Sequence, residues 1–140
     1  MSNPITSTRE EHERQLVRSF FLPQRQERYL ELLAKPRRRD DATEEFAHFK
    51  NLDTRWTVAI APSSQNPSDI FRILRAKGAP EVCYALSENS ALDGKELSLS
   101  WALEKINGRA IGTFLSCLPG ELAYFENEDQ RCILERRTKA

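Results

Sequence analysis

The chain has 140 residues, of which 39% are apolar and 30% are charged, and lysine plus arginine equals aspartate plus glutamate at 21 each. This length suffices for one domain with its own hydrophobic core, and this composition excludes a disordered chain. The two signs of charge also balance separately in residues 1–53 and 54–140. No segment therefore carries the basic excess that dominates nucleic-acid affinity, and nucleic acid is disfavoured as a partner.

The glycines divide the chain into two parts, because all five lie between Gly78 and Gly120. Glycine supplies the backbone conformations with positive φ that tight turns need. The glycine-free start therefore predicts helices, and the remainder predicts strands and turns. We expect a single domain over 1–140, with a disordered tail over 1–7, a helical part over 8–53 and a mixed sheet with two crossover helices over 54–137.

Three helices are expected in the first fifty residues, near 8–21, 24–34 and 41–50. Thr8 suits a helix N-cap with a glutamate three residues later, as in a capping box, and Pro23 suits the first turn of the second helix. The aromatic side chains of these helices are expected to pack together or onto the sheet: Phe20, Phe21, Tyr29, Phe46 and Phe49.

The remainder alternates strand-like and helix-like segments. Helices are expected over 67–77, where Asn66 and Pro67 form a strong helix start, and over 99–106, where apolar residues recur at helical spacing. Strands are expected from β-branched and aromatic runs bounded by turn residues, over 56–61, 82–86, 111–118, 122–126 and 131–135.

Strands that are joined through a helix are expected to be parallel, and the last three strands to form an antiparallel meander. The strands over 56–61 and 82–86 should then be parallel neighbours or near neighbours. The predicted fold class is α/β to α+β: three N-terminal helices followed by β-α-β-α-β-β-β with a mixed five-stranded sheet.

Two polar loops, 62–66 and 87–93, follow the strands that are expected to be parallel. In open α/β sheets, ligands bind outside the carboxyl ends of such strands, and the first loop also leads into a helix N-terminus that favours an anion. The same residue types serve as ordinary helix caps and turns, and a glycine-rich phosphate loop is missing. The candidate crevice comprises Ser63, Ser64, Asn66, Ser87, Glu88, Asn89, Asp93 and Cys117.

Other reactive residue types in the sequence give weaker signals. Cys83, Cys117 and Cys132 lack the close spacing of zinc ligands, so they predict buried reduced thiols, and no metal or cofactor is expected. The tripeptide that begins at Asp93 has the acid-x-Lys form of metal-dependent nucleases, but it is common and here predicts a turn. His48 is expected to be structural.

The basic run Arg37 to Arg39 is followed at once by Asp40 and Asp41, so it predicts a solvated loop rather than a phosphate site. The patterns of a nucleophile elbow and of a zinc-protease helix are missing from the sequence. Neither a signal peptide nor an apolar run of membrane length is evident, so a cytoplasmic protein without a membrane partner is expected.

The leading hypothesis is a non-enzymatic intracellular protein-interaction or regulatory domain. Its N-terminal helices would offer a surface to a protein partner or to a second copy of the chain. The alternative is a small enzyme or small-molecule binder that uses the crevice at 62–66 and 87–93. A weaker alternative is nucleic-acid binding through 37–39.

Overall fold

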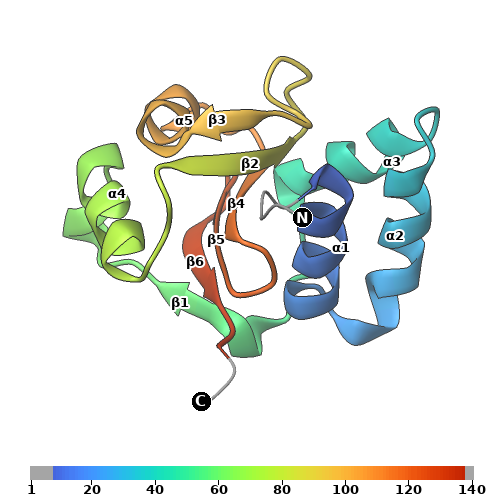
Figure 1. The fold of residues 1–140 in the computed structure, drawn as a ribbon, viewed down its shortest axis with the longest axis horizontal. Coiled ribbons are helices and arrows are strands. Elements are labelled where there is room, and N and C mark those ends of the chain that lie inside the picture. Colours follow the sequence, from blue (N-terminus) through green and yellow to red (C-terminus); the bar gives the residue numbers. More distant parts are fainter. Residues whose placement is uncertain (1–7, 138–140) are drawn as a thin grey trace, which may run out of the picture.

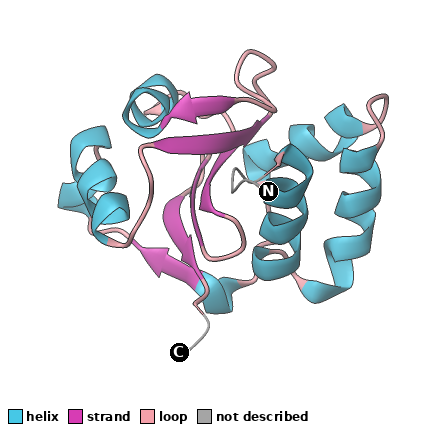
Figure 2. Cartoon of the chain, in the orientation of Figure 1, coloured by secondary structure: helices cyan, strands magenta, loops and turns pink. Residues whose placement is uncertain are grey.

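An antiparallel sheet lies between two layers of helices in the computed structural model, which describes residues 8–137 (Figures 1 and 2). The helices of the N-terminal part cover one face: α1 (Arg9–Phe20), α2 (Gln26–Ala34) and α3 (Arg39–Thr43). The other face is covered by α4 (Pro67–Ala76) and α5 (Leu99–Ile106). The disordered tail expected over 1–7 lies outside the described residues.

The sheet has the strand order β1-β6-β5-β4-β2-β3, and every neighbouring pair is antiparallel. Its strands are β1 (Thr57–Ala59), β2 (Val82–Ser87), β3 (Glu96–Ser98), β4 (Thr113–Leu118), β5 (Leu122–Glu126) and β6 (Arg131–Glu135). The mixed helix-and-sheet class is confirmed. The predicted mixed five-stranded sheet is wrong, because the described residues form six strands and β3 was not foreseen.

The predicted neighbourhood of β1 and β2 is also wrong. Four antiparallel steps give these two strands the same direction, but β6, β5 and β4 lie between them. At about 4.8 Å per strand, their separation is roughly 19 Å. The carboxyl ends of β1 and β2 thus share one edge of the sheet without forming the gap of a parallel pair.

Local capping explains where the helices begin. The Thr8 hydroxyl accepts the Glu11 N–H at 3.0 Å, and the Asn66 side chain accepts the Asp69 N–H at 2.9 Å at the start of α4. The expected third helix over 41–50 is interrupted, because α3 is followed by a 3-10 helix, Glu44–His48. Three further 3-10 turns lie at Pro23–Arg25, Thr54–Trp56 and Pro62–Ser64.

Two hydrophobic cores lie on the two faces of the sheet, as strand alternation requires. The core beneath the N-terminal helices contains an aromatic cluster, whose rings lie 4.3 to 6.1 Å apart between centroids. This cluster confirms the expected packing for four of the five aromatic helix residues, and the fifth, Phe20, is buried in the same core. The members of the cluster are Phe21, Tyr29, Phe46, Phe49, Phe114 and Phe125. Within the part of the chain that the structure describes, no helix has the length and apolarity to cross a membrane.

Candidate functional site: the groove between helices α1, α2 and α3

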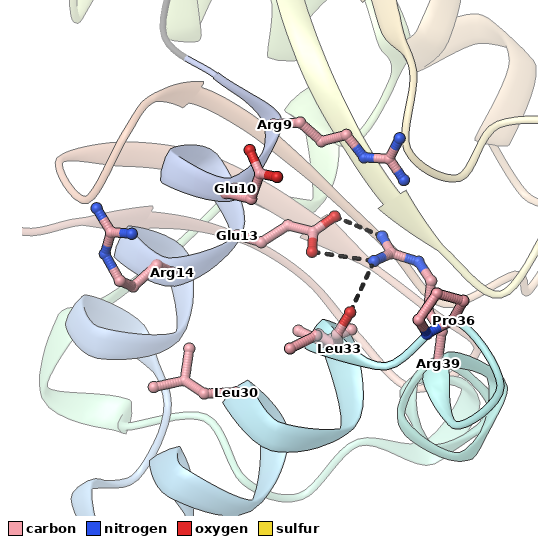
Figure 3. Close-up of a pocket in the computed structure, with 9 residues that line it drawn as sticks. Arg9, Glu10, Glu13, Arg14, Leu30, Leu33, Pro36 and Arg39 are labelled. Atoms are coloured by element: carbon pink, nitrogen blue, oxygen red, sulfur yellow. Dashed lines mark hydrogen bonds and ion pairs between the residues drawn. The ribbon is translucent and has the colours of Figure 1, made fainter.

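An open groove of about 700 Å³ lies between α1 on one side and α2 with the start of α3 on the other (Figure 3). This volume is in the range of ligand-binding clefts. The apolar wall comes from α2 and the turn after it, with Leu30, Leu33, Ala34 and Pro36. The charged wall and base carry Arg9, Glu10, Glu13 and Arg14 from α1 and Arg39 from α3.

The base of the groove is a nearly buried ion-pair network centred on Arg39. Its guanidinium donates two hydrogen bonds to the Glu13 carboxylate, at 3.0 and 2.5 Å, and a third from Nε to Asp93 at 2.7 Å. The three side chains are only 14%, 10% and 15% exposed. Asp93 also accepts the Ser87 N–H, so the network joins α1, α3 and the loop after β2.

The charge of Arg39 is fixed by these partners. Burial by itself would lower the pKa of Arg39, but the hydrogen bonds and charges of Glu13 and Asp93 outweigh burial and raise it. The guanidinium is thus positively charged at neutral pH. It therefore serves as a permanent bridge between the walls of the groove rather than as a proton donor.

A second polar contact joins α1 to the sheet beside this network. The His12 Nδ1 lies 2.7 Å from the Ser116 hydroxyl, and the His12 ring stacks on Tyr84 at 5.2 Å. The Tyr84 hydroxyl donates to Glu13, and burial followed by this bond raises the pKa of Tyr84. A serine beside a histidine can act as a nucleophile pair. Here both residues are buried, so the Ser116 hydroxyl is shielded from solvent.

Acidification should destabilise the protein through His12. Burial lowers its pKa below the ordinary value, although the charges of Glu96, Glu11 and Glu13 oppose that effect. The unfolded chain therefore takes up this proton at a higher pH than the folded chain. The stabilising contribution of the neutral ring is complete above the unfolded-state pKa and is lost as the pH falls below it.

We expect the wild type to lose up to about 1 kcal/mol more free energy of unfolding than His12→Asn between about pH 8 and about pH 5.5. Urea unfolding at both pH values measures this difference. The asparagine can keep a hydrogen bond to Ser116 but cannot take up the proton. Equal pH dependence of the unfolding free energy in the two proteins would contradict a lowered pKa of His12 in the folded state.

The chain matches no protein-family model, and searches of curated proteins and of solved structures found no match to it. The function must therefore be inferred from the side chains of the groove and the contacts that hold them.

The structure does not gather the eight predicted crevice residues into one site. Ser63 and Ser64 lie in the 3-10 turn after β1, and Asn66 caps α4. Asp93 binds Arg39 on the face that the N-terminal helices cover, whereas Cys117 is buried in the core on the opposite face. The cause is the strand order, which places three strands between β1 and β2.

The remaining crevice residues make internal contacts after β2. The Ser87 hydroxyl bonds that of Thr113 at 2.8 Å, and the Glu88 carboxylate accepts the Gly112 N–H at 2.6 Å. The Asn89 side chain accepts the Ala91 N–H and so forms a local turn. Ser87, Glu88 and Asn89 thus each bind a group within the protein.

The expected burial of the three cysteines is confirmed. Cys83, Cys117 and Cys132 are free and buried, and burial raises the pKa values of Cys83 and Cys132 to about 12. Such thiols hold almost no thiolate at neutral pH and are poor nucleophiles. Within residues 8–137, no cluster of three or more His, Cys, Asp or Glu side chains could hold a metal ion.

The predicted solvated loop over 37–39 is wrong for its last residue. Arg38 is exposed and pairs with Asp41, but Arg39 turns inward to Glu13 and Asp93. His48 is exposed and reaches the β5–β6 hairpin, where Asp129 and Glu128 raise its pKa.

Glu13 is the site residue that the sequence analysis missed most clearly. His12 and Glu13 precede Leu16 and Val17 by four residues, so they lie on the buried stripe of α1. Ionisable side chains on an apolar stripe are uncommon unless they are paired. That anomaly was the available signal for a buried polar network.

Proposed function

We propose that this chain is a non-enzymatic interaction domain that binds an apolar segment of a partner protein in the groove between α1, α2 and α3. The observation that carries the proposal is an apolar wall beside a groove floor whose charged side chains, Glu13 and Arg39, already bind each other. Leu30 is only partly buried, and Ala34 and Pro36 are exposed beside it, so this wall can accept further apolar contacts.

The hydrogen bonds at the floor of the groove favour binding over catalysis. Both Glu13 oxygens accept from Arg39, and one of them also accepts from Tyr84. A general base needs a free lone pair within reach of the proton that it removes. The Glu13 carboxylate already accepts three hydrogen bonds from Arg39 and Tyr84, which disfavours that role and leaves apolar contact as the main contribution to ligand binding.

The same network favours a preformed groove. Arg39 ties α3 to α1 through Glu13 and to the loop after β2 through Asp93, so both walls are held before any partner arrives. A preformed surface loses less conformational entropy on binding than one that must be ordered. The alternative of a small enzyme at 62–66 and 87–93 would need a ligand that reaches across three intervening strands.

A selection from a library of random peptides displayed on phage tests the proposal. Selected peptides should bind the wild type and lose roughly tenfold in affinity to Leu30→Glu, because a charge then replaces partly buried apolar surface. Val82→Glu is the matched control, since Val82 is an apolar residue 48% exposed on β2, outside the groove.

Circular dichroism of each variant should verify the fold. The proposal fails if the selection yields no binders, or if the binders tolerate Leu30→Glu as well as they tolerate Val82→Glu.

A further inference from the structure

The charges of the groove have an order along α1. Arg9 and Arg14 are five residues apart, which is about 7.5 Å along a helix axis. Figure 3 shows their side chains extending in opposite directions from α1, with Glu10 between them, and both residues line the groove. The apolar residues Leu30 and Leu33 face the middle of this series from α2.

The two end arginines differ from Arg39 in what they contact. Both are exposed, and among residues 8–137 neither forms an ion pair. Arg39, in contrast, uses its guanidinium on Glu13 and Asp93. The positive charge that the groove offers to a partner therefore lies at its two ends.

The centre of the charged wall has the opposite sign. Glu10 is exposed and would repel a carboxylate placed in the middle of a bound segment. Glu13, the other acid of this wall, is neutralised by Arg39. The groove therefore offers a positive, negative, positive series opposite an apolar wall.

On the basis of the proposed function, we infer that the partner segment has an apolar centre and a carboxylate at each end. The apolar side chains pack on Leu30, Leu33 and Pro36, and the two carboxylates pair with Arg9 and Arg14. Electrostatic complementarity of this kind sets the orientation and specificity of binding more than its total affinity. The order of charges in the partner, rather than its net charge, is therefore the recognised feature.

Three synthetic peptides distinguish the effect of charge order in the partner from the effect of its amino-acid composition. The first has the core Glu-Leu-Ala-Leu-Glu, the second has the same residues as Leu-Glu-Ala-Glu-Leu, and the third has lysine in place of both glutamates of the first. Fluorescence anisotropy should show the first peptide binding about tenfold more tightly than either of the others at low salt, and the difference should shrink as salt rises.

A charge reversal in the protein gives the complementary test. Arg14→Glu should weaken the first peptide by about fivefold and strengthen the lysine peptide, because exposed ion pairs contribute modestly and reverse with the sign of one partner. Arg109→Glu, which reverses an exposed arginine outside the groove, should leave the affinities for both peptides within about twofold.

Equal binding of the two glutamate isomers, or an unchanged preference in Arg14→Glu, would overturn the inference. If library peptides need Leu30 but lack terminal acids, the inference fails while the proposed function stands. If analytical ultracentrifugation shows a dimer that Leu30→Glu dissociates, the inference is overturned. The occupant of the groove is then a second copy of this chain and not an acidic segment.

Discussion

Arg39→Ala should lower the free energy of unfolding by about 3–5 kcal/mol at neutral pH. The substitution leaves Glu13 and Asp93 without their cation, while both side chains are at least 85% shielded from solvent. Two unpaired carboxylates in that environment repel each other and lack hydration. Urea unfolding followed by circular dichroism measures the loss.

Arg38→Ala is the matched control for this prediction. Arg38 is the preceding residue and pairs with Asp41, but about half of each side chain is exposed, at 55% and 52%. Exposed pairs of this kind contribute about 1 kcal/mol or less. A loss for Arg39→Ala no larger than that for Arg38→Ala would show that the network contributes little.

Removing one of the two carboxylates that Arg39→Ala leaves unpaired supplies a second check. Combining Glu13→Gln with Arg39→Ala should recover part of the lost free energy, because one buried charge is removed with little change in side-chain size. Additive losses in the double variant would instead mean that Glu13 and Arg39 do not interact energetically.

The helix starts could be predicted because their causes are local. The Thr8 and Asn66 caps depend on side chains within three residues of the helix, and both appear in the structure as expected. The predicted extent of the third helix is wrong, because the chain after Thr43 tightens to a 3-10 helix. This 3-10 helix carries Phe46 into the aromatic cluster. Packing of one side chain overrides helix propensity there.

The strand directions could not be predicted from the same local patterns. Strand β2 is almost uniformly apolar, which is typical of parallel strands covered on both faces. Here two helical layers bury both faces of an antiparallel sheet, so the same pattern arises with the opposite direction. Strand β3 was missed because it has three residues, Glu96–Ser98, of which two are polar.

Residue spacing along the sequence could not predict the candidate site, because the contacts of the site join residues that are far apart in the chain. Arg39 meets Asp93 at a separation of 54 residues, and Tyr84 meets Glu13 at a separation of 71. Their proximity depends on α1 and α3 lying beside β2, which only the tertiary fold determines. The sequence did favour the N-terminal helices as the binding surface, and the groove proposed here lies among them.

Phe114→Ala should lower the free energy of unfolding by about 3–5 kcal/mol, the usual cost of removing a fully buried aromatic side chain. Phe114 is 0% exposed on β4, and its ring lies 4.3 Å from that of Phe125 and 4.9 Å from that of Phe46 between centroids. Phe71→Ala is the control, because Phe71 is only partly buried in the other core and should cost clearly less.

The contact with Phe46 also makes this substitution a test of how the helical part is attached to the sheet. The rings of Phe46 and Phe114 meet edge to face, at 83°. A double-variant cycle should therefore give a coupling free energy of about 0.5–1.5 kcal/mol. If residues 8–53 and the sheet form one cooperative unit through this cluster, Phe114→Ala should shift a single unfolding transition to lower urea. A second, separate transition, or a loss below about 1 kcal/mol, would show that the aromatic cluster does not join the two parts.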